Sequence, residues 1–405
     1  MSETNCSQGN ASVQTAGKCL FVYSESYQRF TMGETHPMKL IRLKLTHDLA
    51  RACGLLEGER ASVIEAEPVD ADLVRRVHSP QYLNVLQSVN DGSVSFEASR
   101  FGLGTSDCPI IAGVWDYSLL SAGASVQCAE TVSKGEAHAA FNIAGGLHHA
   151  MPNRASGFCY LNDPAIAIRY LLERGYRVAY VDIDAHHGDG VQQIFYDSDR
   201  VLTISLHESG QFLFPGTGFE QEIGSGAGEG YSVNVPLFPY TDDEVFCWAF
   251  DQIVPTFIEA FQPDYLVTQL GCDSFRDDPL THLALTTNGF CYAVNSLKKL
   301  ARGRWIALGG GGYRVSNVAR AWTLAWGIMS GQEVPEEIPV EFLAELEQSG
   351  VMKLFPEFHH LRKMHDPVYT ATETQQCRTH AERVVGFLLA KVLPKVKSTS
   401  TVPPP

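Results

Sequence analysis

The sequence predicts an α/β protein: a single domain with a mainly parallel central sheet and helices on both faces. Two observations support this class. Short β-branched or aromatic runs alternate with longer helical patterns along the interior of the chain, and neither an internal repeat nor a long linker interrupts them. Strands that alternate with helices are typical of βαβ units, whose parallel strands are covered on both sides.

Five runs are expected to be strands, at 139–144, 177–183, 201–206, 265–270 and 305–308. Helical patterns lie at about 110–132, 163–174, 243–261, 288–302, 316–330 and 377–393. Each of the five strand runs is followed by glycines and reactive side chains. Because ligands bind outside the carboxyl ends of parallel strands, these five clusters are expected to meet in one site.

Composition excludes several classes of protein. The 405 residues are 44% hydrophobic and 19% charged, as in a globular protein, and the net charge of −15 argues against direct nucleic-acid binding. No apolar run approaches the roughly 20 residues that cross a bilayer, and the first residues lack a signal-like apolar segment. The ten cysteines show no C-x-x-C spacing, which indicates free thiols in a reducing compartment. We therefore expect a cytoplasmic protein without membrane contact, with a catalytic domain at 19–394 and disordered tails at 1–18 and 395–405.

Two strand ends provide a candidate metal site. Asp184 and His186 follow the run 177–183, and residues two apart in an extended segment project to the same side. Asp273 follows the run 265–270. D-x-H alone is weak evidence, because such residues also cap helices and fill loops. Two carboxylates, one imidazole and an open position nevertheless match a catalytic zinc site, so one zinc ion is expected.

His148 and His149 follow the first strand run in the string GGLHHAMP. Adjacent histidines cannot both bind one metal without strain, and in isolation such a pair is more often part of a core. Beside a hydrated metal we interpret them as proton-transfer groups. Asp182 and Asp189 bracket the metal segment and are the expected acceptors that fix the histidine tautomers.

The run 305–308 leads into GGGGY, which ends at Tyr313. The string lacks the lysine of a phosphate-binding loop and the G-x-G-x-x-G spacing, so a nucleotide site is not favoured. The glycines let the backbone approach a substrate and leave Tyr313 free to aim its hydroxyl at a carbonyl as an oxyanion donor. Phe158 and Phe214 are candidate apolar walls of the site, with ordinary core packing as the alternative.

Taken together, these strings resemble the zinc-dependent histone deacetylase family. Over about residues 20 to 330 the chain contains, in order, HPMK, DCP, GGLHHA, ASGFCYLND, VDIDAHHGDG, ISLH, FPGTG, YSVNVPL, QLGCD and LGGGGY. The resemblance implies an arginase-like fold, hydrolysis of the amide of an ε-N-acyl-lysine in proteins or peptides, and inhibition by hydroxamates.

The resemblance also implies a role for each matching residue. Asp184, His186 and Asp273 would bind zinc, the relays would be His148–Asp182 and His149–Asp189, and Tyr313 would polarise the carbonyl. Substrate would contact Asp107, Gly157, Phe158, Phe214 and Leu280, and Arg42 would lie in an inner channel for acetate. Because Asp182 lies beside a metal ligand, we expect His148 to be the less basic histidine and His149 to be the general base.

The family also binds potassium, and the resemblance implies two such sites. The first would use Asp182, Asp184, His186, Ser205 and Leu206. The second would use Phe195, Ser198, Val201 and Tyr231. Several of these ligands are backbone carbonyls, which any side chain could supply.

The chain departs from the nuclear enzymes of the family after Asp273. The string SFRDDPLTHLALT looks more like the bacterial acetoin-utilisation branch, and Pro279 and Ser316 stand where the nuclear enzymes have arginines for inositol phosphate. We therefore expect a bacterial deacylase that does not bind inositol phosphate.

Three alternatives stay open. A ureohydrolase with two manganese ions would need carboxylates at Gly188 and Gly271, so it is disfavoured. An acetylpolyamine or other small-molecule amide deacetylase would use the same machinery, and net charge does not separate the two. A catalytically inactive binding module is disfavoured because every expected ligand, both relay pairs and the tyrosine are present.

Overall fold

The computed structural model describes residues 17–397. The tails expected at 1–18 and 395–405 therefore lie outside the described residues, apart from positions 17–18 and 395–397. Within the described range, no helix is both long enough and apolar enough to cross a membrane.

Eight parallel strands form one sheet in the described range, in the order β2-β1-β3-β8-β7-β4-β5-β6. The strands are β1 (Cys19–Tyr23), β2 (Ala61–Glu65), β3 (Ala139–Asn142), β4 (Val178–Asp182), β5 (Val201–Glu208), β6 (Ser232–Leu237), β7 (Tyr265–Gln269) and β8 (Trp305–Leu308). Every residue of β3, β4, β5, β7 and β8 is buried. Strands covered on both faces are near-continuous apolar runs, as these sequences are.

The five predicted strands are confirmed, and they are contiguous in space as β3-β8-β7-β4-β5. The three strands that were not predicted lie outside this block. β2 alternates between buried and exposed positions, and β6 contains Asn234 and Pro236, so both have weaker apolar runs. β1 is fully buried, and its CLFVY run could have been recognised.

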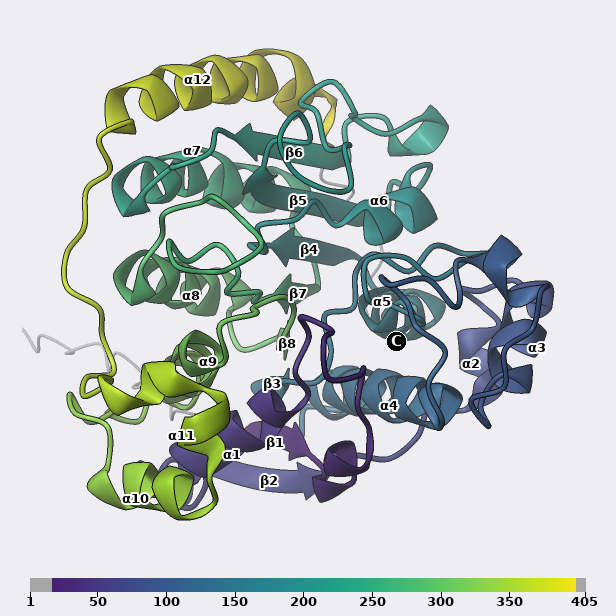
Figure 1. Ribbon diagram of the computed structural model, residues 1–405. Helices are drawn as coiled ribbons and strands as arrows, with labels where there is room; N and C mark the ends of the chain where they lie inside the picture. The colour runs from purple at the N-terminus through teal and green to yellow at the C-terminus, as the bar shows by residue number, and fades with distance from the viewer. Residues whose placement is uncertain (1–16, 398–405) are drawn as a thin grey trace, which may run out of the picture.

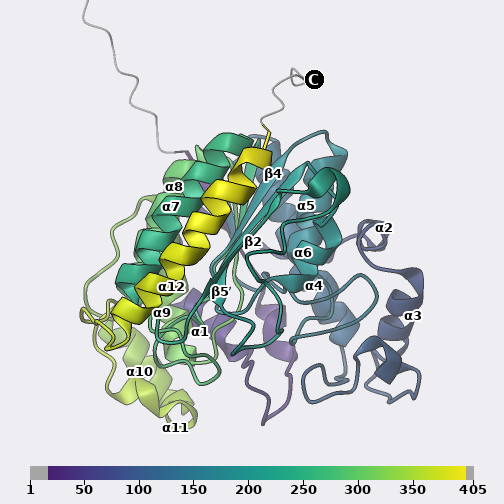
Figure 2. The same ribbon diagram turned by 90° about the horizontal axis from the view of Figure 1, so that it is seen from above.

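Helices cover both faces of the sheet, as predicted. α7, α8 and α9 lie on one face, and α4, α5 and α6 lie on the other (Figure 1, Figure 2). The helices are α1 (Ile41–Ala52), α2 (Ala71–Val74), α3 (Pro80–Ser88), α4 (Val114–Ser133), α5 (Asp163–Glu173), α6 (Asp189–Phe195), α7 (Asp243–Phe261), α8 (Thr287–Ala301), α9 (Val315–Ser330), α10 (Val340–Gln348), α11 (Val351–Leu354) and α12 (Thr374–Phe387).

The six predicted helices correspond to α4, α5, α7, α8, α9 and α12. Local sequence explains several of their starts: the side chains of Asn162, Asp242 and Thr286 accept main-chain hydrogen bonds at the first turns of α5, α7 and α8. α4 begins later than predicted, after Gly113 in a left-handed conformation. α12 packs against α7 and β6, so it covers the outer edge of the sheet (Figure 1).

Candidate active site

The carboxyl ends of the five central strands meet at one edge of the sheet. Strand register places Asp182 of β4 beside Ser205 of β5 and Gln269 of β7. The segments that follow these strands bring together all the residues predicted from the five sequence clusters.

Asp184, His186 and Asp273 form the predicted cluster. One ligand atom from each of these buried side chains lies within 4.8 Å of the others. His186 Nδ1 lies 2.9 Å from Asp273 Oδ2 and 3.2 Å from Asp184 Oδ1. In the part of the chain that the structure describes, this is the one group of three or more such side chains close enough to share a metal ion.

Neighbouring groups hold the two carboxylates in place. Asp184 Oδ2 accepts hydrogen bonds from Gly311 N at 2.7 Å and Gln269 Nε2 at 2.6 Å. Asp273 Oδ1 accepts one from Ala185 N at 2.8 Å. A Cβ atom at Gly311 would lie 2.0 Å from Asp273 Oδ2, and one at Gly271 would lie 2.1 Å from Asp184 Oδ2. A side chain at either position would displace these carboxylates, so glycine at both positions keeps the cluster in this arrangement.

The buried carboxylates favour a cation between them. Burial, and then the negative charge of Asp184, raise the pKa of Asp273 to about 6. Buried charges in proteins are paired or coordinate metals, and two oxygen donors with one imidazole suit a divalent ion. The residues present therefore fit a zinc site.

Each of the tandem histidines pairs with its expected carboxylate. His148 Nδ1 lies 2.7 Å from Asp182 Oδ2, and His149 Nδ1 lies 2.7 Å from Asp189 Oδ1. Asp182 is also bonded by the Tyr180 hydroxyl at 2.7 Å and by Asp184 N at 3.1 Å. Both Nε2 atoms point to the same space and lie 3.1 Å apart, so one ring must carry the proton between them.

His148 is more basic than His149, which is the reverse of our expectation. Burial opposes the charged form of His148, but Asp182 and Asp184 outweigh it and raise the pKa of His148 to about 9. Burial, and then the charge of His148, lower the pKa of His149 despite its bond to Asp189. Sequence reasoning missed that Asp184 Oδ1 approaches His148 Nε2 to 4.0 Å and adds a second negative charge.

Tyr313 lies at the same edge, with its ring 6.3 Å from His186 and 5.6 Å from Phe158. Burial, and then Asp273 and Asp184, raise its pKa well above the usual value, so the hydroxyl keeps its proton. Its main-chain N donates to Asp278 Oδ2 at 2.8 Å.

The ring of Phe158 lies beside Tyr313, and that of Phe214 lies beside His149 and His186. Phe158 is partly buried, and the ring of Phe214 is 45% exposed and lies 5.0 Å from His149. Asp107 is partly exposed, and its Oδ2 accepts the N–H of Gly157 at 2.7 Å. Phe158 and Phe214 thus lie beside Tyr313 and His149, and Asp107 is bonded to the residue before Phe158; their contact with substrate stays a prediction.

Two further expected residues lie close by. Arg42 is 2% exposed and donates to Gly312 O at 2.9 Å, while its Nε has no partner in the described residues. Leu280 is partly buried, and its N donates to Asp278 at 3.0 Å. Arg42 thus lies beneath the glycine string that leads to Tyr313.

The residues of the two expected potassium sites are also grouped. Asp182 and Ser205 are register partners, with Leu206 next along β5. Phe195 ends α6, Val201 begins β5, and Ser198 N donates to Phe195 O at 3.0 Å. Tyr231 precedes β6, and its carbonyl accepts the N–H of Thr203 at 2.9 Å.

Sequence reasoning missed the residues that support the site. Gln269 holds Asp184, and Asp163 accepts the N–H groups of Gly146 and Leu147 ahead of the histidines. A polar residue at the end of an apolar strand run was the available signal for Gln269. For Asp163, in the string LNDPA, the signal was indistinguishable from an ordinary helix start.

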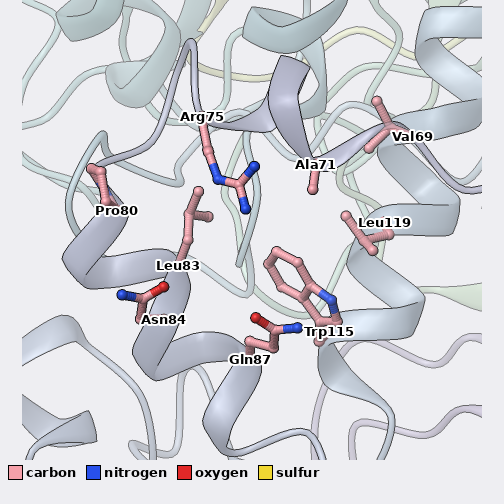
Figure 3. A pocket seen from close by; sticks show the side chains of 9 residues that line it. All are labelled: Val69, Ala71, Arg75, Pro80, Leu83, Asn84, Gln87, Trp115 and Leu119. Atoms are coloured by element: carbon pink, nitrogen blue, oxygen red, sulfur yellow. The ribbon is translucent and has the colours of Figure 1, made fainter.

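A separate cavity of about 160 Å³ lies between α2, α3 and α4 (Figure 3). Leu83, Trp115 and Leu119 give it apolar walls, and Arg75, Asn84 and Gln87 lie along it (Figure 3). None of the residues given for its lining is a histidine, cysteine, aspartate or glutamate.

Comparisons with known proteins agree with this geometry. Residues 36–329, more than half of the chain, match the family described as histone deacetylase domain. Acetoin utilization protein AcuC of Bacillus subtilis (strain 168) is 39% identical over 333 residues, which cover 80% of this chain and 86% of that protein. Histone deacetylase 1 of Homo sapiens is 39% identical over 328 residues, covering 80% of this chain and 67% of the human protein.

Solved structures show the same fold. The crystal structure of an HDAC homolog complexed with SAHA has a TM-score of 0.83 and 32% identity, covering 92% of this chain and 100% of that chain. An HDAC homolog from Aquifex aeolicus has a TM-score of 0.81 and 33% identity, covering 90% of this chain and 100% of that chain.

The parallel α/β fold, the site at the carboxyl edge of its sheet and the comparisons together place the chain in the class of deacetylase hydrolases. The chain belongs to the histone deacetylase family. The resemblance read from the sequence motifs is therefore confirmed, including the similarity to the acetoin-utilisation branch.

Proposed function

We propose that this deacetylase is a zinc-dependent enzyme that removes acetyl or other acyl groups from the ε-amino group of lysine in proteins and peptides. One observation carries the proposal. The buried cluster of Asp184, His186 and Asp273 lies beside two imidazoles, each hydrogen-bonded to a carboxylate.

Asp184, His186 and Asp273 are the proposed zinc ligands. An ion held by them supplies Lewis acidity toward the amide carbonyl and the attacking water. Fe(II) or Co(II) would also suit two oxygens and one nitrogen, because affinity alone does not choose among such ions.

His149 is the proposed general base and then general acid. With its Nδ1–H donated to Asp189, its Nε2 takes a proton from water and returns it to the departing lysine amine. The assignment is supported by the different protonation of the two rings. Burial opposes the charged form of His148, but Asp182 and Asp184 outweigh burial and raise the pKa of His148 to about 9, so His148 holds its proton. Burial, and then the charge of His148, lower the pKa of His149, so its Nε2 is available as a neutral base.

The remaining residues are proposed to bind the substrate. The lysine methylenes pack between Phe158 and Phe214, the Tyr313 hydroxyl donates to the developing oxyanion, and Asp107 accepts the peptide N–H groups at the rim. Gly157 and Leu280 form the entrance beside them, and Arg42 attracts the departing acetate. The SAHA complex of an HDAC homolog supports hydroxamate binding at this site.

Potassium and a cytoplasmic location complete the proposal. The first proposed potassium site consists of Asp182, Asp184, His186, Ser205 and Leu206. The second consists of Phe195, Ser198, Val201 and Tyr231, which lie around the start of β5. The nine cysteines of the described residues are all free, which supports a reducing compartment.

The test compares kcat/KM for an acetyl-lysine peptide with that for acetylated polyamines, alongside metal analysis. We expect at least a tenfold preference for the peptide and one catalytic metal per chain. Asp273→Ala should lose both metal and activity. The opposite preference would assign the enzyme to small amides, and two catalytic metals would contradict the site itself.

A further inference from the structure

The loop between Asp273 and α8 links the metal cluster to the oxyanion tyrosine. Asp278 lies in this loop and is 7% exposed. Its Oδ2 accepts the main-chain N–H of Tyr313 at 2.8 Å, and its Oδ1 accepts that of Leu280 at 3.0 Å. One carboxylate therefore joins the loop that carries a proposed zinc ligand to the segment that carries Tyr313.

Other bonds hold the main chain just before Tyr313: Gly311 N donates to Asp184 Oδ2 at 2.7 Å, and Arg42 donates to Gly312 O at 2.9 Å. Asp278 is the side chain that bonds the main chain of Tyr313 itself. Arg314 follows it and gives α9 no side-chain cap. Among the described residues, no group makes a hydrogen bond to the Tyr313 hydroxyl, and its ring neighbours are Phe158 and His186.

We propose that Asp278 is a positioning residue that sets where the Tyr313 hydroxyl lies relative to the acyl carbonyl. The Thr281 hydroxyl donates to Asp273 O, so the same loop is tied at one end to the metal cluster and at Asp278 to the tyrosine. This inference rests on the proposed role of Tyr313 as an oxyanion donor.

The presence of an aspartate at position 278 supports the proposed positioning role. A carboxylate can accept both N–H groups, whereas an asparagine has one acceptor oxygen and would direct its amide N–H groups at the other donor. Keeping a buried carboxylate near Asp273 is costly, because two buried negative charges repel each other. A group whose task was only to fill space would not need two acceptor oxygens there.

A double-mutant cycle tests the proposal. Asp278→Ala should lower kcat on an acetyl-lysine peptide about 10- to 100-fold, with KM changed less than about threefold and metal content unchanged. Asp278→Asn should fall between the wild type and Asp278→Ala. In the Tyr313→Phe background, Asp278→Ala should lower the residual kcat by less than about threefold, because coupled residues are not additive.

The same cycle measured on the Kd of a hydroxamate separates this proposal from the proposed substrate. If the peptide is not turned over but the hydroxamate binds, the substrate assignment fails and the Kd cycle still reports on Asp278. Arg276→Ala is the matched control: Arg276 lies in the same loop but is exposed, and its guanidinium lies over the ring of Tyr369, so kcat should change less than about twofold. Equal effects of Asp278→Ala in both backgrounds, or a crystal structure of that variant with Tyr313 unmoved, would overturn the proposal.

Discussion

Tyr313 and the tandem histidines His148 and His149 are proposed to have different roles in the reaction. The Tyr313 hydroxyl keeps its proton because burial and the nearby carboxylates raise its pKa well above the usual value. It can therefore donate to charge that develops only in the transition state.

Replacing Tyr313 by phenylalanine should leave the metal and the fold intact but remove most turnover. Loss of one oxyanion donor costs about 3 kcal/mol, or roughly 10²–10³ in kcat. The measurement is kcat on an acetyl-lysine peptide, with metal content and thermal unfolding as controls. An unchanged kcat would remove Tyr313 from the mechanism.

The two histidines should differ when each is replaced by alanine. His149→Ala should cost at least the roughly 10²–10⁴ in kcat/KM that is typical of an acid–base group. His148→Ala should cost less, since its loss weakens orientation and the local field rather than the proton transfer itself. Both variants are measured on one peptide with metal content determined, and a larger loss for His148→Ala would reverse the assigned roles.

Among the structural elements, the connection from α2 to α3 supports the segment that follows the tandem histidines. His78 lies in this connection and is 2% exposed. Its Nδ1 lies 3.0 Å from Met151 O, and its Nε2 accepts the N–H of Asn162 at 3.0 Å. Asn162 in turn donates to the carbonyls of His148 and Ala150. The ring must be neutral to accept from Asn162.

The titration of His78 should make the free energy of unfolding depend on pH. Burial lowers the pKa of His78 to about 4 from an ordinary 6.5, so the unfolded chain binds the proton more readily. The stabilisation is fully present above pH 6.5 and is lost as the pH falls toward about 4. Between pH 7 and pH 5 the loss amounts to about 2 kcal/mol, at about 1.4 kcal/mol per pKa unit.

Urea unfolding of the wild type and of His78→Gln at both pH values measures this loss. The difference between the two proteins removes contributions from other groups, including the metal ligands. His78→Gln should be less stable at pH 7, because Met151 O and Asn162 N lose well-placed partners. An equal pH dependence in both proteins would show that His78 does not titrate as described.

For the whole molecule, binding at the site should stabilise the entire fold. The proposed ligands and relay groups lie at or after the ends of three strands of one sheet, β3, β4 and β7, and Tyr313 follows a fourth, β8. A hydroxamate at 100 times its Kd should add about 2.7 kcal/mol to the free energy of unfolding. Removing the metal with a chelator should lower the melting temperature and abolish the hydroxamate shift. A shift that survives metal removal would mean that the inhibitor binds elsewhere.

The sequence by itself determined the fold class, the five central strands and the residues that follow them. These features are local: a strand buried on both faces must be apolar along its length, and reactive groups after such runs stand out. The same strings also carried the resemblance to the deacetylase family.

Only the tertiary structure decided which groups meet. The approach of Asp184 to His148, the bond of Gln269 to Asp184 and the tie from Asp278 to Tyr313 join segments 35 or more residues apart. The relative basicity of His148 and His149 depends on the sum of such contacts, and so it could not be predicted from either residue's neighbours in the chain. Electrostatic energies fall with distance in space, and the fold alone sets that distance.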